Sequence, residues 1–394
     1  MTSRRLFLRG LGGLTTSGIY FCNCCNADEI PSLVPVGGNW DKGGQDLGND
    51  PTLSYRHPLA GTKRKPFFYN GKRIKVIDTH AHCFFPEAVL LAGTGSYVNG
   101  AVKGGPEHYI PASAKDIIQR RIENMDAKGV DMEVLSVNTF WYSKDKELAV
   151  EICRINNSNL AELCEAYPNR FAAFGSIATQ YPEIAVKQLT EIMKNPVFKG
   201  VAIQANVAGV EHSDPRFHPV WAKAEELGAV LFIHPQGTPQ LAQRFKGNGW
   251  ISNVIGNPLD TTIALQHLIY EGILDKFPDL KVLAAHGGGF LGSYAARMDH
   301  SCFVSPSNCN SNISLKKKPT DYLSQIFFDS LVFTPEGLRH LVAQVGSQQI
   351  VVGTDSPIPW EDFPVDHVLK TPISDAQKAA ILGGNAAKLL RITE

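Results

Sequence analysis

From Lys72 to the end of the chain, short apolar runs alternate with longer segments in which apolar residues recur every three or four positions. Short runs rich in β-branched side chains have the length of strands, and the longer periodic segments fit amphipathic helices. Eight strands are therefore expected, at residues 74–78, 130–138, 171–177, 200–204, 229–233, 280–285, 325–329 and 349–353. Helices are expected between them, at residues 113–128, 145–167, 182–195, 215–227, 258–276, 335–345 and 375–390, with a less regular one at 287–299.

The alternation of strands and helices predicts a parallel sheet covered by helices. Eight repeats favour a closed (β/α)8 TIM barrel, an α/β fold, over an open doubly wound sheet. An open nucleotide-binding sheet would carry a glycine-rich phosphate loop after its first strand, whereas this chain has Thr79-His80-Ala81-His82 there. The segment from Phe84 to about Ala112 is long for a connection inside a barrel. We interpret it as a lid or insertion after strand 1.

The barrel is predicted to occupy residues 71–394, which leaves two segments before it. Residues 28–70 are rich in Pro, Gly, Asn and Asp without periodicity, and are interpreted as an extended N-terminal arm. Residues 1–27 resemble a twin-arginine signal peptide, with Arg4-Arg5 before a Gly-rich, weakly apolar run and Cys25-Asn26-Ala27 as a cleavage site. Such a signal predicts a periplasmic or exported protein. The competing interpretation is a basic tail on a cytoplasmic protein.

The composition of the chain argues against two classes of partner. The chain has 38 Lys+Arg and 38 Asp+Glu, so its formal net charge is zero, and we expect neither nucleic acid nor an anionic membrane surface as a partner. No segment of the sequence is long and apolar enough to span a bilayer. Eight cysteines are present, three crowded at positions 22, 24 and 25 and the others scattered. A chain of this size buries its own core, so disulfide bonds are not expected to organise the fold.

Side chains suited to chemistry stand where four of the expected strands end. His80 and His82 are two residues apart in an extended segment, so both point to the same face. The fifth strand ends in His234, the sixth in His286 and the eighth in Asp355. Each residue alone also fits a structural role, such as a core histidine or a helix N-cap. Because active sites of these barrels lie at the carboxyl ends of the strands, their convergence indicates a site for a first-row divalent metal.

Five segments occur together in the order and spacing of a known family: IDTHAH (77–82), MDAKGVDMEVLS (125–136), FIHP (232–235), AAHGGG (284–289) and VVGTD (351–355). From about Lys75 to Leu390 the chain resembles the aminocarboxymuconate-semialdehyde decarboxylase-like family of the amidohydrolase superfamily. The resemblance implies one divalent metal, with zinc as the first choice and manganese as the alternative. It assigns the metal ligands to His80, His82, His234 and Asp355.

The resemblance also implies roles around the metal. His286 matches the catalytic histidine that hydrogen-bonds the metal-bound water and shuttles protons, and Asp355 is expected to act as a second catalytic group. Arg297 matches an arginine that reaches across a homodimer interface to hold a substrate carboxylate. Trp250 falls where the family has an aromatic wall.

The expected reaction is the metal-dependent, non-oxidative decarboxylation of a small aromatic or muconate-like carboxylic acid. Aromatic residues in loops after strands, among them Phe85 and Trp141, suit a flat substrate, and packing under the lid is the plainer interpretation of each. Residues 107–113 contain no arginine where the family's decarboxylases have an arginine-rich stretch, which argues against aminocarboxymuconate semialdehyde itself as the substrate. Two alternatives stay open. One is a hydrolase of a lactone, amide or ester. The other is a barrel that only binds a ligand, which the intact set of five site residues argues against.

Overall fold

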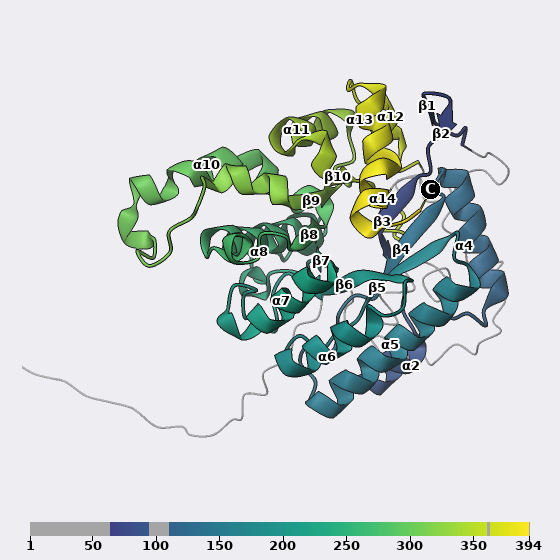
Figure 1. The fold of residues 1–394 in the computed structure, drawn as a ribbon, viewed down its shortest axis with the longest axis horizontal. Helices are drawn as coiled ribbons and strands as arrows, with labels where there is room; N and C mark the ends of the chain where they lie inside the picture. The colour runs from purple at the N-terminus through teal and green to yellow at the C-terminus, as the bar shows by residue number, and fades with distance from the viewer. Residues whose placement is uncertain (1–63, 94–109, 361–362, 394) are drawn as a thin grey trace, which may run out of the picture.

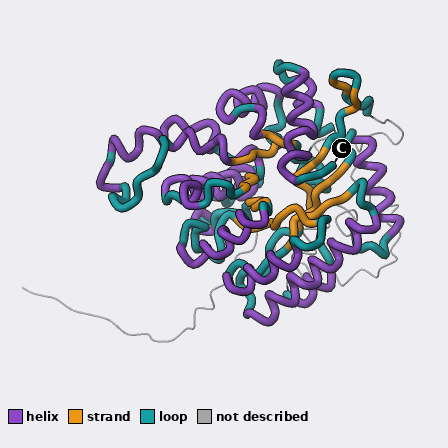
Figure 2. Tube along the Cα trace, in the orientation of Figure 1, coloured by secondary structure: helices purple, strands orange, loops and turns teal. Residues whose placement is uncertain are grey.

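The computed structural model describes residues 64–93, 110–360 and 363–393, and within them eight parallel strands form a barrel ringed by helices (Figures 1 and 2). The strands are β3 (Ile77–His82), β4 (Met132–Ser136), β5 (Phe171–Gly175), β6 (Phe198–Gln204), β7 (Val230–His234), β8 (Lys281–Ala284), β9 (Ile326–Asp329) and β10 (Ile350–Val351). Each pairs in parallel with the next along the chain. The barrel closes where Thr79 N–H donates to the Val352 carbonyl and Asp355 N–H donates to the His80 carbonyl, each at 2.8 Å. The predicted (β/α)8 barrel is confirmed.

Helices cover the outside of the barrel, and many of their apolar residues belong to the larger buried cluster. They are α2 (Pro86–Leu91), α4 (Lys115–Lys128), α5 (Lys146–Ala166), α6 (Pro182–Ile192), α7 (His218–Leu227), α8 (Asn257–Tyr270), α9 (Ile273–Lys276), α10 (Leu291–Val304), α11 (Pro335–Val345), α12 (Asp366–Lys370), α13 (Asp375–Ala379) and α14 (Asn385–Leu390). In α5 the buried positions include Ile152, Leu160 and Leu163, and Asp145 caps the first turn by accepting from Leu148 N–H at 2.9 Å. A π-helical segment, Ala380–Gly384, joins α13 and α14, so the helix predicted at 375–390 contains one wider turn.

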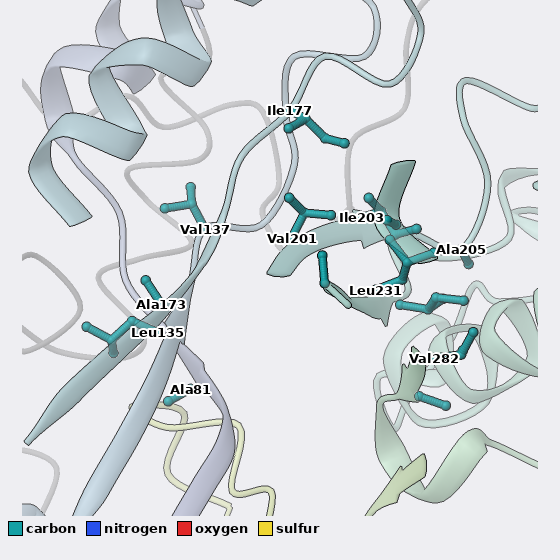
Figure 3. Packing of buried hydrophobic residues seen from close by; sticks show 14 of the residues in the cluster. Ala81, Leu135, Val137, Ala173, Ile177, Val201, Ile203, Ala205, Leu231 and Val282 are labelled. Atoms are coloured by element: carbon teal, nitrogen blue, oxygen red, sulfur yellow. The ribbon is translucent and has the colours of Figure 1, made fainter. Parts of the chain in front are cut away.

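Alternate residues along the strands contribute to two hydrophobic clusters. Leu135, Val201 and Leu231 belong to the larger cluster, which packs between the strands and the surrounding helices (Figure 3). The smaller cluster takes residues of opposite parity, such as Val134 and Phe232, and we place it inside the barrel. The ring centroid of Phe232 lies 5.0 Å from that of His80. The inner core therefore ends directly beneath the expected site.

The chain before the barrel differs in part from the extended arm predicted for residues 28–70. Phe68–Tyr69 (β1) and Lys72–Arg73 (β2) pair as an antiparallel hairpin that crosses the predicted boundary at residue 71. The rest of the arm up to residue 63, the predicted signal peptide and residues 94–109 of the predicted lid lie outside the described residues. The signal peptide, the exported location and the lid therefore stay predictions.

The described residues contain one disulfide bond, which lies outside the hydrophobic clusters. Cys302, near the end of α10, is bonded to Cys309 in the following loop, and their Cα atoms lie 5.7 Å apart. The bond closes the tip of an element that extends outward from the barrel (Figure 1). Cys83, Cys153 and Cys164 are buried free thiols. In the part of the chain that the structure describes, no helix has both the length and the apolar character needed to cross a membrane.

The close approach of β6 to β7 gives a test of the barrel packing. Gly200 has φ +150°, and a Cβ added there would lie 2.0 Å from the Val230 carbonyl oxygen. Gly209 has φ +86°, but a Cβ there would meet no atom within 4 Å, so Gly209→Ala is the matched control. We expect Gly200→Ala to lower the free energy of unfolding by at least about 2 kcal/mol more than the control, because the methyl group forces the two strands apart. Urea denaturation measures both values, and equal losses would contradict the strand packing described.

Candidate active site

The five side chains expected to form the site meet at the carboxyl ends of the strands. His80 and His82 lie on β3, His234 ends β7, and His286 and Asp355 follow β8 and β10. His80 Nε2 lies 3.0 Å from His82 Nε2, and Asp355 Oδ1 lies 3.3 Å from the first and 2.9 Å from the second. The ring of His234 lies 4.6 Å from that of His82 and 5.4 Å from that of His286, measured between centroids. The structure thus gathers all five residues in one cluster.

A buried carboxylate on β9 connects two of these strand ends. Asp329 has no exposed surface, and its Oδ2 lies 2.6 Å from His80 Nδ1. The same oxygen accepts from the His286 N–H at 2.9 Å, and Oδ1 accepts from the N–H groups of Gly287 and Leu331 at 2.8 and 3.0 Å. The contact with Nδ1 leaves Nε2 of His80 facing the cluster, which is the arrangement found around metal-binding histidines.

His82 and Asp355 are oriented in the same way by partners outside the cluster. Ser136 Oγ lies 3.0 Å from His82 Nδ1, which leaves Nε2 facing inward. Trp360 Nε1 donates to Asp355 Oδ2 at 2.7 Å, which leaves Oδ1 facing the histidines. Asp78 Oδ1 accepts from the His80 N–H at 3.0 Å and from the N–H of the residue before Asp355 at 3.1 Å. The first and last strands therefore share a buried carboxylate beneath the site.

Burial and the carboxylates determine the charge of the cluster. Burial alone would lower the pKa of His80, but hydrogen bonds with Asp329 and Asp355 raise it to about 10. Burial lowers the pKa of His234 well below its ordinary value, and burial together with the charge of His80 lowers the pKa of His286 to about 4. Burial alone would raise the pKa of Asp355, but its hydrogen bonds with the histidines hold it well below the ordinary range. Two ionised carboxylates thus favour a cation here, beside neutral imidazoles.

This donor set fits a divalent metal ion. His80, His234, His286 and Asp355 each offer one ligand atom, and these four atoms all lie within 4.8 Å of one another. This group of four includes His286 in place of His82, which the resemblance assigns as a metal ligand. His82 lies next to the group, with its Nε2 3.0 Å from His80 Nε2. Nδ1 of His234 and Nδ1 of His286 are buried without a hydrogen-bond partner among the described residues. Imidazole nitrogens and a carboxylate are the ligands that zinc and related divalent ions take.

Two residues of the cluster have a strained backbone. His286 has φ +56° and Asp355 has φ +57°, in the left-handed region that residues other than glycine seldom adopt. Such conformations cost about 1–3 kcal/mol each and persist only where surrounding contacts fix them. The N–H of His286 is held by Asp329, and the N–H of Asp355 is held by the carbonyl of His80. The strained residues therefore belong to the candidate active site.

The aromatic residues expected to contact substrate have different surroundings. Phe85 and Trp141 are fully buried in the hydrophobic core, and Trp141 Nε1 donates to the Ile177 carbonyl at 2.9 Å. Substrate contact by either residue stays a prediction. Trp250 is 37% exposed and stacks on Trp360, with centroids 5.6 Å apart and planes at 17°. Because Trp360 is hydrogen-bonded to a cluster residue, the stacked pair lies beside the site.

Arg297, the residue expected to bind a substrate carboxylate, lies outside the cluster. It is exposed on α10 and lines a surface pocket of about 720 Å³ together with Tyr270 of α8 and Tyr294 of α10. None of the five cluster residues lines this pocket. Among the described residues, Arg297 has no ion-pair partner. The role of Arg297 at the cluster, which the resemblance assigns across a homodimer interface, therefore stays a prediction.

Two residues near the cluster have no assigned role in the sequence-based prediction. Asp329 ends the seventh expected strand. Its position at a strand end could have identified it as a site residue, because the same reasoning identified Asp355. Trp360 stands in the loop after the eighth strand, where it counts only as one of several loop aromatic residues. Its contact with Asp355 depends on the path of that loop, which the sequence pattern does not reveal.

Comparison with known proteins places the chain in a family. The family model described as amidohydrolase matches residues 77–392, so the chain belongs to the amidohydrolase family. The chain is 28% identical over 339 residues to the 2-amino-3-carboxymuconate-6-semialdehyde decarboxylase of Dictyostelium discoideum, an alignment that covers 80% of this chain and 91% of that protein.

Solved structures agree with the fold. The 5-carboxyvanillate decarboxylase from Sphingomonas paucimobilis matches with a TM-score of 0.70 at 26% identity, over 81% of this chain and 100% of that one. A 5-carboxyvanillate decarboxylase from Novosphingobium aromaticivorans, solved with manganese and 4-hydroxy-3-methoxy-5-nitrobenzoic acid, matches with a TM-score of 0.70 at 22% identity, over 81% of this chain and 96% of that one. The fold described above is therefore shared with these structures.

The role of Asp329 can be tested by an isosteric change. Whichever way the amide of Asp329→Asn turned, its NH2 group would face donors that now bond a carboxylate oxygen. We expect about a 10- to 100-fold loss of metal affinity, as is typical when a partner of a ligating histidine is removed. The measurement is bound metal per chain against free metal concentration. Asp299→Asn alters a carboxylate that, among the described residues, contacts Thr320 and Lys318, and it serves as the control. Equal affinities for the two variants would contradict this role.

Proposed function

We propose that this protein is a metal-dependent, non-oxidative decarboxylase of a small aromatic or muconate-like carboxylic acid. The observation that carries the proposal is the convergence of His80, His82, His234, His286 and Asp355 on one point. These residues also suit a hydrolase of a lactone, amide or ester. The decarboxylase is favoured because the relatives described above are decarboxylases, one of an aminocarboxymuconate semialdehyde and one of 5-carboxyvanillate.

His80, His82, His234 and Asp355 would hold the metal in this proposal. Three of them are already turned toward the centre of the cluster by hydrogen bonds from outside it. Zinc is our first choice, because imidazole nitrogens and carboxylate oxygens are among its usual protein ligands. Manganese, which is bound in the Novosphingobium structure, is the alternative. When bound, the metal polarises a substrate oxygen and lowers the pKa of a coordinated water.

His286 would move the proton that the reaction needs. Burial lowers the pKa of its imidazole, so the ring is neutral at neutral pH and has a nitrogen lone pair that can accept a proton. In the decarboxylation a proton adds to the carbon that bears the carboxylate. The bond between the two carbons then breaks, its electron pair returns to the substrate, and carbon dioxide leaves. His286 would take a proton from a substrate hydroxyl or water and deliver it to that carbon, and Asp355 would be the second group of the site able to exchange a proton.

Arg297 would complete the site from a second chain, so the working unit in this proposal is a homodimer. We expect light scattering of the purified protein to give twice the mass of one chain. Arg297→Ala should keep that mass and raise KM for the substrate acid at least about tenfold, because a charge-assisted contact with the carboxylate is lost. A monomeric mass at the concentration of the activity assay would contradict the dimer.

The proposed reaction is tested by carbon dioxide release. Purified protein with a known metal content is incubated with a panel of phenolic, heteroaromatic and muconate-like acids. We expect release from at least one class of acid, loss of release after treatment with a chelator, and recovery when zinc or manganese is restored. A protein that releases no carbon dioxide from any acid and hydrolyses lactones or amides instead would contradict the proposal and support the hydrolase.

The variant His286→Ala is measured in the same carbon dioxide assay. We expect it to retain the metal content of the unaltered protein and to lose turnover by at least about 100-fold, since proton transfer by a positioned side chain contributes about 10²–10⁴-fold. His340→Ala alters a half-buried histidine on α11 outside the cluster and is the control. Full activity of His286→Ala would remove His286 from the mechanism.

A further inference from the structure

Trp360 contacts three residues beside the proposed metal site. Its Nε1 donates to Asp355 Oδ2 at 2.7 Å. Its ring stacks on Trp250, at 5.6 Å and 17°, and meets the edge of Phe333 at 5.7 Å and 62°. One half-buried indole thus joins the carboxylate of the cluster to an aromatic surface that is partly open, since Trp250 is 37% and Phe333 is 42% exposed.

All three partners of Trp360 have a left-handed backbone. Asp355 has φ +57°, Trp250 has φ +52° and Phe333 has φ +64°. For residues that are not glycine this conformation is unfavourable, and bulky aromatic residues adopt it rarely. Strained residues persist where their surroundings fix them, and they gather at functional sites. The contacts of Trp360 are a shared element of those surroundings.

The hydrogen bond from Trp360 also determines which oxygen of Asp355 faces the histidines. With Oδ2 engaged by the indole N–H, Oδ1 lies 2.9 Å from His82 Nε2 and 3.3 Å from His80 Nε2. Without that N–H the carboxylate could rotate about its terminal bond, which is a broad and soft torsion. The indole therefore restricts Asp355 to presenting one oxygen.

From these contacts we propose that Trp360 is a positioning and specificity residue of this site. Its N–H holds Asp355 with one oxygen toward the metal, and its ring, stacked on Trp250, forms a flat wall that selects planar aromatic acids over flexible ones. The second half of this statement rests on the proposed decarboxylase function. The first half concerns metal binding and stands independently of the reaction.

Two substitutions separate the two roles. Trp360→Phe keeps a ring that can stack on Trp250 but removes the N–H donor. Trp250→Phe keeps the Trp360 N–H and its bond to Asp355 but changes the wall. Zinc affinity is measured for each by competition with a coloured chelator, and kcat and KM are measured with one aromatic and one non-planar acid. Thermal unfolding of the metal-free variants controls for loss of the fold.

We expect Trp360→Phe to weaken zinc binding at least about tenfold. Trp250→Phe should leave zinc affinity within about twofold and raise KM for the aromatic acid more than for the non-planar one. If Trp360→Phe does not fold, Trp360→Leu replaces it as the variant without a donor and should weaken zinc binding by the same factor. Trp360→His is the rescue variant, because an imidazole overlies the five-membered ring of the indole and keeps a donor. It should bind zinc as the unaltered protein does.

Each result bears on a different half of the proposal. Unchanged zinc affinity in Trp360→Phe, or zinc loss in the histidine variant, overturns the positioning role. Equal changes in KM for both acids overturn the selectivity of the wall. If no acid is decarboxylated at all, the proposed reaction and the wall's role in it fail together, and the zinc affinities still decide whether Trp360 positions Asp355.

Discussion

The candidate site depends on the closure of the barrel between its first and last strands. The hydrogen bond from the Asp355 N–H to the His80 carbonyl joins residues from nearly opposite ends of the barrel sequence. In an open sheet β3 and β10 would be the two edges, and the carboxylate of Asp355 would lie far from the histidines of β3. Closure instead places Asp355 Oδ1 within 3.3 Å of both His80 and His82. Asp329 then connects β9 to His80 and to the backbone of His286, so the strand ends form one bonded unit.

This unit concentrates charge at buried and half-buried positions. Buried carboxylates are unfavourable unless they are paired or bind a metal. Asp329 and Asp355 flank His80 and raise its pKa to about 10, which shows that the two carboxylates favour a positive charge at this point. Burial meanwhile keeps His234 and His286 neutral, which leaves their nitrogens able to act as ligands or proton acceptors. A divalent ion bound among these groups would pair with the carboxylates and take up the lone pairs of the neutral imidazoles.

The sequence predicted the barrel and the five cluster residues because both follow from local patterns. Strand and helix periodicity places the eight barrel strands and most of the helices around them within a few residues, and parallel strands deliver their carboxyl ends to one face. What it missed depends on tertiary contacts. The hydrogen bonds of Asp329 require the relative heights of three strands, and the bond from Trp360 to Asp355 requires the path of an irregular loop. The Cys302–Cys309 bond is local, but the scattered cysteine pattern does not distinguish it from chance spacing. Loop aromatic residues were the weakest inference, because Phe85 and Trp141 belong to the core whereas Trp250 is partly exposed.

The central claim is that the strand ends bind one metal ion at the point where His80, His82, His234 and Asp355 converge. Anomalous diffraction from crystals of the metal-loaded protein, collected at the absorption edge of the bound metal, tests it most directly. The account predicts a single peak per chain, at about 2.0–2.2 Å from one atom of each of these four residues if the metal is zinc. A peak at another place, or a cluster that stays free of metal at saturating concentration, would contradict the account.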